Sequence, residues 1–196
     1  MPITPDETWD ELFGELYFRA YEGLHERDSE SEALAAAALA GVEAPAEIID
    51  APTGFGRHAI PLAKNGFRVT GVDRSEVQLA EARRAAGDVE WPKWMQGDVR
   101  ELPVDESSFD AVLCLFTSIG YRGEPGDRAA FAEFLRVLSP GRRLVLETLH
   151  RDRLSSIFRD RSWDRLSDDA VRLEERLLGA SGTKSGYQEA AKPHSS

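Results

Sequence analysis

Short apolar runs alternate with amphipathic stretches through the middle of the chain. The runs predict strands, because turn residues bound them and they are too short for buried helices. The amphipathic stretches predict helices, because their apolar residues recur at helical spacing. Strands are expected at Ile48–Ala51, Arg68–Val72, Trp94–Gln96, Ala111–Phe116 and Arg142–Thr148, and helices at Arg57–Asn65, Glu76–Ala86 and Arg128–Leu138. This alternation is typical of an α/β fold with a doubly wound, mainly parallel sheet at residues 47–149.

Residues 7–40 carry two helical patterns in front of this core, the first aromatic and the second rich in alanine and ending at Gly41. We therefore expect residues 1–46 to form an amino-terminal helical cap.

The pattern changes again after Leu149. A helix is expected at residues 151–158, a strand or a helix at 170–178, and a disordered tail at 179–196, where small and polar residues dominate. The predicted organisation is one domain over residues 1–178, in which 150–178 begins a segment that covers the site.

Composition narrows the functional classes. The chain has 196 residues and a formal net charge of -11, with no basic patch, so nucleic acid is not an expected partner. No apolar run is long enough to predict a membrane span. The first ten residues are acidic and polar, which favours a cytoplasmic location. The only cysteine, Cys114, lies in an apolar run, where a buried, inert thiol is expected and no metal site is indicated.

The first strand ends at a loop suited to a ligand. In "IIDAPTGFGRHAIPLA" an aspartate, Asp50, ends the strand, and Gly54 and Gly56 let the backbone turn and approach a bound molecule. The helix that follows offers free backbone N–H groups to a carboxylate or another anion. The same spacing also occurs in turns that only close a tight connection, so this loop alone does not decide a function.

Acidic residues also end the second and third strands. Asp73 in "VTGVDRS" is placed to accept hydrogen bonds from both hydroxyls of a ribose, or else to cap the next helix, as Ser75 could also do. Asp98 in "QGDVRELP" could accept from an exocyclic amine or simply stabilise a turn. The fourth strand leads into small and aromatic residues in "FTSIGY", which could form the floor of a small pocket. Three successive strands that each end in an aspartate are less probable by chance than one such strand.

These motifs together resemble the class I S-adenosylmethionine-dependent methyltransferases, over Ile48 to Leu149. "DAPTGFGRHAIPLA" matches the glycine-rich motif of that family, "VTGVDRS" its ribose motif and "GDVRELP" its adenine motif. The "GRH", "FTSIGY" and "ETLHRDRL" runs are similar to the bacterial branch that acts on small molecules. The resemblance implies a Rossmann-like fold, S-adenosyl-L-methionine as cofactor and a small-molecule acceptor, but it does not identify the acceptor atom.

The resemblance also implies which residues contact the cofactor. Pro52 stands where the family has its first glycine, and Thr53 stands where a cysteine is usual. Proline has no backbone N–H, so the loop tolerates it if no hydrogen bond from this position is needed. No catalytic base is assigned, since His58 and His150 qualify only by residue type. The expected cofactor contacts are Tyr21, Asp50, Pro52, Thr53, Gly54, Gly56, Arg57, Asp73, Arg74, Gly97, Asp98, Val99, Leu115 and Phe116.

The residues after Thr148 depart from the family pattern, which continues with a sixth strand and an antiparallel seventh. We expect a chain that lacks these carboxyl-terminal strands and leaves its fifth strand as a sheet edge, where a second copy could pair. The alternative function is therefore a truncated, non-catalytic S-adenosylmethionine-binding domain. A nucleotide-dependent oxidoreductase is disfavoured, because its fingerprint needs a third glycine where this chain has Ala59.

Overall fold

The computed structural model describes Phe13 and residues 28–150, 152, 158–159, 161–165, 170–179 and 182–191. These residues fall into two compact units, one containing Phe13 and residues 28–148 and the other the described residues from Leu149 onward. No helix in this described part is both long enough and apolar enough to cross a membrane.

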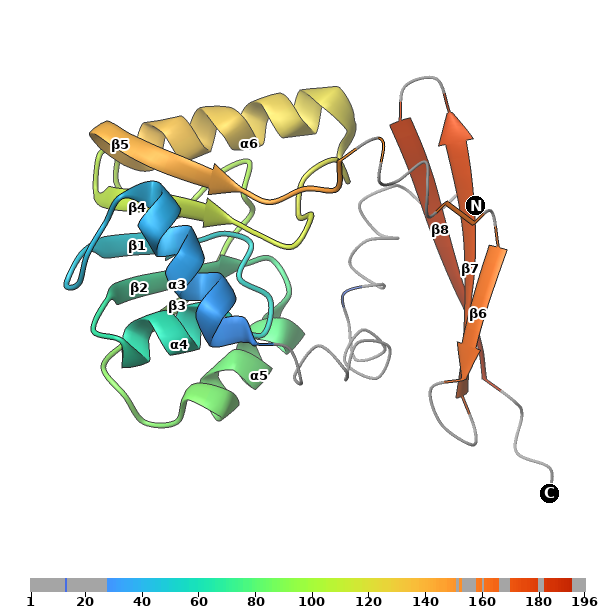
Figure 1. Ribbon diagram of the computed structural model, residues 1–196, viewed down its shortest axis with the longest axis horizontal. Coiled ribbons are helices and arrows are strands. Elements are labelled where there is room, and N and C mark those ends of the chain that lie inside the picture. Colours follow the sequence, from blue (N-terminus) through green and yellow to red (C-terminus); the bar gives the residue numbers. More distant parts are fainter. Residues whose placement is uncertain are drawn as a thin grey trace. The chain divides into compact units, whose positions relative to one another are not determined.

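The first unit is built on a five-stranded parallel sheet with strand order β3-β2-β1-β4-β5 (Figure 1). Its strands are β1 (Glu47–Asp50), β2 (Arg68–Asp73), β3 (Lys93–Gln96), β4 (Phe109–Cys114) and β5 (Leu138–Leu146). The order steps outward from β1 in both directions, so β1 and β4 flank the point where the chain reverses its direction of travel across the sheet. The prediction of a doubly wound parallel sheet is confirmed.

Helices cover both faces of this sheet. They are α3 (Ser29–Ala40), α4 (Ala59–Lys64), α5 (Glu76–Ala86) and α6 (Gly123–Val137). Because successive residues of a strand face opposite sides, neighbouring β1 residues enter two different cores. Ile48 packs with α3 and α4, and Ile49 packs with the buried residues of α6.

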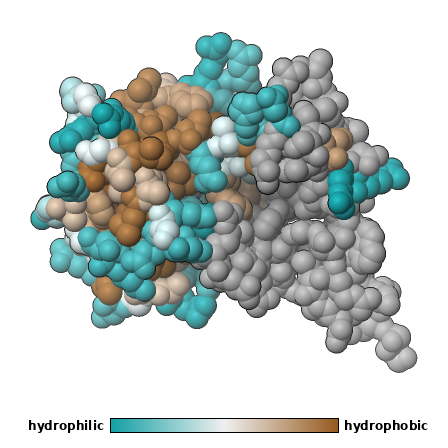
Figure 2. Space-filling model, viewed as in Figure 1, coloured by the Kyte–Doolittle hydropathy of each residue, from teal (hydrophilic) through white to brown (hydrophobic). Residues whose placement is uncertain are grey.

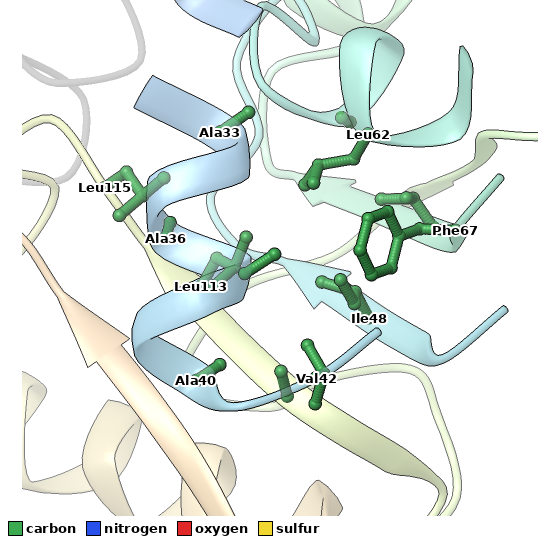
Figure 3. Close-up of a cluster of buried hydrophobic side chains, with 13 residues drawn as sticks. Ala33, Ala36, Ala40, Val42, Ile48, Leu62, Phe67, Leu113 and Leu115 are labelled. Carbon is green, nitrogen blue, oxygen red and sulfur yellow. The ribbon is translucent and has the colours of Figure 1, made fainter. Parts of the chain in front are cut away.

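The core beneath α3 explains its alanine-rich sequence. Small side chains at Ala33, Ala36 and Ala40 let the helix lie close to the sheet, where Ile48 and Leu113 are fully buried (Figure 3). The opposite side of α3 is also apolar, and Leu39 is 69% exposed there. Figure 2, drawn from the direction in which α3 lies in front, shows an apolar area on this part of the surface.

Several element boundaries differ from the prediction in ways that affect the site. α4 begins at Ala59, so Arg57 and His58 belong to the preceding turn and not to the helix. β4 ends at Cys114, which leaves Leu115 and Phe116 in the loop that follows. β5 begins earlier than predicted, and its pairing with β4 shifts register between Phe109 and Ala111.

The second unit contains an antiparallel sheet in the order β6-β7-β8. Its strands are β6 (Arg161–Arg165), β7 (Ala170–Gly179) and β8 (Gly182–Ala191). The segment expected as strand or helix is therefore a strand. The expectation of a disordered tail is wrong for residues 182–191, which pair with β7 along its whole length. The sequence of β8 is polar and has no apolar pattern that predicts a strand. The strand is formed through its hydrogen bonds to β7.

Within the described residues, β5 pairs only with β4 and forms one edge of the parallel sheet. This agrees with the predicted edge strand, while pairing with a second copy stays a prediction. The first aromatic helical pattern, apart from Phe13, and most of the helix expected at 151–158 lie outside the described residues.

Candidate functional site

The loop after β1, residues 51–58, is called the glycine loop below. Its backbone is tied to the neighbouring strand, since Gly54 N donates to Asp73 Oδ2 at 2.8 Å. Ser75 N donates to the other oxygen, Asp73 Oδ1, at 2.9 Å. Asp73 thus joins the tip of β1 to the start of α5, while Ser75 is the residue that caps the helix. Each Asp73 oxygen keeps a further lone pair that can accept from a ligand hydroxyl.

Two glycines of this loop have positive φ. Gly56 has φ +78°, and a Cβ placed on it would lie 2.5 Å from Trp94 Cη2, so no other residue fits without a shift. Gly54 has φ +57°, and its Cβ would have one neighbour within 4 Å, Gln78 Oε1 at 3.7 Å. Among the described residues, nothing else occupies the space above Gly54, which leaves room for a ligand. Pro52, which follows a cis peptide bond, replaces the family's first glycine at a position that needs no backbone donor.

Asp50 lies beneath the loop with 1% of its surface exposed. Thr53 Oγ1 donates to Asp50 Oδ2 at 2.7 Å, and Thr53 N donates to Val72 O at 2.9 Å. Burial raises the pKa of Asp50 to about 7, and the nearby Asp73 charge adds to this rise, whereas the Thr53 hydrogen bond and Arg57 oppose it. Burial also raises the pKa of Asp73, against hydrogen bonds from backbone N–H groups.

The Asp50 carboxyl should make stability depend on pH. Because its pKa rises from 3.8 to about 7 on folding, the folded chain binds this proton more tightly than the unfolded chain. Its contribution to the free energy of unfolding is therefore present below about pH 4 and is lost as the pH rises through about 7. As the pH rises from 5 to 8, the free energy of unfolding measured in urea should fall less for Asp50→Asn than for wild type. Asp88→Asn, at an exposed position, is the control, and equal losses in Asp50→Asn and wild type would contradict the assignment.

Asp98 is already engaged by two arginines. Arg100 forms a bidentate pair with it, with Nε 2.9 Å from Oδ1 and Nη2 2.7 Å from Oδ2, and Arg74 Nη1 lies 3.3 Å from Oδ2. Burial pushes the pKa of Asp98 up, but the Arg100 hydrogen bonds and the two positive charges outweigh it and hold the pKa below its ordinary value. An amine donor would share this carboxylate with the arginines. The role of Asp98 toward adenine stays a prediction. So do the cofactor contacts of the half-buried Val99 and of Gly97, whose backbone packs on Pro103.

Arg57 and His58 end the glycine loop in contact with the first turn of α3. Arg57 Nη1 lies 2.7 Å from Glu32 Oε2 and donates to Ser29 Oγ at 3.1 Å. His58 Nε2 donates to the same Glu32 oxygen at 3.3 Å. Burial and the Arg57 charge lower the pKa of His58 to about 4, against the opposing effect of Glu32. His58 is therefore neutral at pH 7, and so low a pKa makes its buried imidazole a weak base, which is poorly suited to general-base catalysis.

The loop after β4 lies against Arg57, at the end of the glycine loop. Phe116 and Thr117 have φ values of +59° and +57°, which L-residues rarely adopt and which are stabilised here by Glu147. Phe116 N donates to Glu147 Oε2 at 3.0 Å, and Thr117 N donates to Glu147 O at 3.1 Å. This conformation places the Phe116 ring centroid 4.9 Å from the Arg57 guanidinium carbon. Leu115 is buried in the core.

A cavity of about 390 Å³ lies at the ends of β2 and β3. It includes two predicted contacts, Asp73 and Arg74, and its other lining residues are Phe13, Ser75, Glu76, Gln96 and Arg122. Phe13 is held there because Ser75 Oγ and Gln78 Nε2 both donate to its backbone carbonyl, at 3.0 and 3.3 Å. Its ring packs edge-on against Tyr121, with centroids 5.6 Å apart.

Sequence reasoning did not assign Phe13, Gln96 or Arg122 to the site. Phe13 was visible only as one member of an aromatic helical pattern, and nothing local marks Gln96 or Arg122. Gln78 is 2% exposed, and a polar residue on the buried face of α5 was the one available signal. Tyr21 lies outside the described residues, so its expected contact is not tested.

The sequence profile of the family described as "Methyltransferase domain" matches residues 48–141, which span β1 to the start of β5 and contain most of the site. These residues, called the methyltransferase domain below, are therefore similar to that family. The expected Rossmann-like fold is confirmed, and the match agrees with the expected family.

Curated relatives of the methyltransferase domain act on different molecules according to their names. The demethylmenaquinone methyltransferase of Deinococcus radiodurans is 38% identical over 115 residues, 57% of this chain and 46% of the relative. The glycine/sarcosine N-methyltransferase of Parasynechococcus marenigrum is 37% identical over 110 residues, 55% of this chain and 39% of the relative. The chain spans about half the length of the curated relatives it matches, or less.

Among solved structures, the domain is similar to S-adenosylmethionine-bound CalS10, an amino pentose methyltransferase from Micromonospora echinaspora. The identity is 27% and the TM-score 0.62, covering 90% of this chain and 80% of CalS10. DesVI from Streptomyces venezuelae shares the fold, with a TM-score of 0.67 and 23% identity. The similarity covers 89% of this chain and 80% of DesVI.

The residues around the glycine loop fit S-adenosyl-L-methionine, the expected cofactor, on geometric grounds. The glycine loop presents an open backbone above Gly54. Two buried side-chain atoms beside this loop, Arg57 Nη2 and Gln78 Oε1, have no hydrogen-bond partner in the described part of the chain. Buried polar atoms are nearly always paired, so an unpaired donor and an unpaired acceptor beside a ligand loop are explained by a bound molecule.

Proposed function

We propose that this chain transfers a methyl group from S-adenosyl-L-methionine to a nitrogen, oxygen or carbon nucleophile of a small molecule. The observation that carries the proposal is the Gly54–Asp73 hydrogen bond at 2.8 Å. It brings the glycine loop after β1 and the carboxylate at the end of β2 together at the edge of the sheet where doubly wound folds bind ligands. The cavity of about 390 Å³ adjoins the same carboxylate.

The proposed contacts follow from these positions. Asp73 would accept hydrogen bonds from the ribose hydroxyls, and the open backbone at Gly54 and Gly56 would lie along the methionine end. When bound, the cofactor supplies a methyl group that its sulfonium has already activated. The chain then has to hold the acceptor in line and exclude water. The remaining sequence-predicted contacts, Tyr21 included, belong to this proposal.

The acceptor is proposed to be a small molecule on the grounds of charge and similarity. A net charge of -11 disfavours a nucleic acid, whose phosphates would be repelled. The relatives act, by their names, on demethylmenaquinone or on glycine and sarcosine. We also propose a cytoplasmic enzyme. No catalytic base is assigned, because positioning alone serves many acceptors of an activated methyl group.

Calorimetry and a transfer assay test this proposal. The full chain is expected to bind S-adenosylhomocysteine and to transfer labelled methyl groups to at least one member of a panel of amines, hydroxy acids and phenols. Binding without transfer to any of them would favour the second candidate, a non-catalytic cofactor-binding domain. Absence of binding would contradict both.

A further inference from the structure

Phe13 lines the cavity at the ends of β2 and β3, although it lies far from the other lining residues in the sequence. Its backbone carbonyl is bound at the start of α5, by Ser75 and Gln78. Its ring packs edge-on against Tyr121, in the loop after β4, and the next residue, Arg122, also lines the cavity. Phe13 therefore connects the α5 side of the cavity with the side formed by the loop after β4.

Two donors share the Phe13 carbonyl. Ser75 Oγ donates to it at 3.0 Å and Gln78 Nε2 at 3.3 Å, which uses both lone pairs of the oxygen. Gln78 is 2% exposed, so water does not replace Phe13 easily as the acceptor for its amide. Because a buried donor without an acceptor is unfavourable, the Gln78 amide favours the arrangement in which Phe13 stays in place.

The start of α5 leaves the Gln78 side chain available for this contact. Ser75 caps the helix by accepting from Gln78 N at 3.4 Å. In a capping box, the side chain at the Gln78 position would return to the backbone N–H of the cap residue. Here Ser75 N donates to Asp73 Oδ1 instead, at 2.9 Å. The carboxylate proposed to bind the ribose and the two donors that hold Phe13 thus belong to one hydrogen-bonded turn.

We propose that Ser75 and Gln78 are positioning residues, whose hydrogen bonds to the Phe13 carbonyl hold this residue as a wall of the ligand cavity. This inference rests on the proposed function for the identity of the ligand and adds to it the residues that close the cavity. A ligand that contacts the Phe13 ring favours the closed arrangement. Ligand binding and the two hydrogen bonds therefore stabilise each other.

Chymotrypsin cleavage of the full chain measures these hydrogen bonds. The protease cuts after aromatic residues by attack on their carbonyl carbon, so it cuts the Phe13–Gly14 bond only when the Phe13 carbonyl is released. The rate then follows the population of the released form. Gln78→Met removes one donor at similar volume and should speed this cut about 2- to 12-fold, as expected for one neutral hydrogen bond. Mass spectrometry identifies the fragment that ends at Phe13.

Ser75 offers a matched pair of variants for the same measurement. Ser75→Asp keeps a helix cap but cannot donate to the carbonyl, so it should also speed the cut, whereas Ser75→Thr keeps the hydroxyl and should be cut at the wild-type rate. Asn65→Leu, which removes an exposed amide bound to the Pro61 carbonyl, is the control away from the cavity. Cleavage after the fully buried Phe134 reports global unfolding and should stay unchanged in every variant.

Ligand binding gives a second, independent measurement. Saturating S-adenosylhomocysteine should slow the wild-type cut after Phe13 about tenfold. Phe13→Ala, shown to be folded by circular dichroism, should raise the dissociation constant of S-adenosylhomocysteine by a similar factor. The two factors should agree because both measure the contact between the ring and the ligand.

Each part of the proposal has its own contrary result. The positioning role is overturned if Gln78→Met and Ser75→Asp are cut after Phe13 at the wild-type rate. The role of Phe13 as a cavity wall is overturned if S-adenosylhomocysteine binds without slowing the cut and binds Phe13→Ala as tightly as wild type. If the wild type does not bind S-adenosylhomocysteine, the proposed function fails together with the wall role, while the cleavage rates still decide whether Ser75 and Gln78 hold Phe13.

Discussion

Replacing Asp73 with asparagine should raise the dissociation constant for S-adenosylhomocysteine about 5- to 150-fold, equivalent to about 1–3 kcal/mol. Both Asp73 oxygens already accept backbone N–H bonds, from Gly54 and Ser75, and their remaining lone pairs are the proposed acceptors for the ribose. An asparagine NH₂ would face one of these donors and remove an acceptor. The glycine loop would then lose a tie to β2 as well as a ligand contact.

Calorimetry on folded variants measures this effect, and Asp88→Asn is its control. It removes the same formal charge at an exposed position, so a general electrostatic effect on the cofactor would appear in both variants. A dissociation constant within twofold of wild type in a folded Asp73→Asn variant would rule out the ribose role.

Replacing Gly56 with alanine should lower the free energy of unfolding by about 2–5 kcal/mol. The added Cβ has a positive φ of +78° and would lie 2.5 Å from Trp94 Cη2, in a ring whose Cζ3 also lies within 3.1 Å. An L-residue at such a φ costs about 1–2 kcal/mol, and overpacking adds about 1–3 kcal/mol. Because the loop must shift to relieve the contact, affinity for S-adenosylhomocysteine should fall with stability.

Gly141→Ala separates the two contributions in denaturant unfolding. Gly141 has φ +81°, but no atom of the described residues lies within 4 Å of its added Cβ, so this variant reports the conformational cost alone. Trp94→Phe removes the ring atoms that Gly56→Ala would meet, and the double variant should be less destabilised than the sum of the single ones. Equal losses for Gly56→Ala and Gly141→Ala would show that the Trp94 contact does not constrain the loop.

Local patterns were sufficient to predict the sheet and the strand tips. Apolar runs between turn residues marked the strands, and each tip residue follows its run directly, as Asp50 and Asp73 do. These signals lie within a few residues of one another, and the parallel fold then brings the carboxyl ends of β1 and β2 to the same edge. The glycine loop after β1 and the acidic residues at the neighbouring strand tip were therefore determined by the sequence alone.

The tertiary structure decided what those side chains contact. Asp98 pairs with Arg100 and Arg74, although its position alone suggested a free acceptor. Arg57 is held by Glu32, a residue 25 positions earlier whose role no local pattern shows. Phe13 reaches the cavity only because Ser75 and Gln78 bind its carbonyl, and β8 is a strand only because β7 pairs with it. Each of these outcomes depends on groups that are far apart in the sequence. The stabilising free energy is gained only when these distant segments come into contact, so local sequence patterns do not predict it.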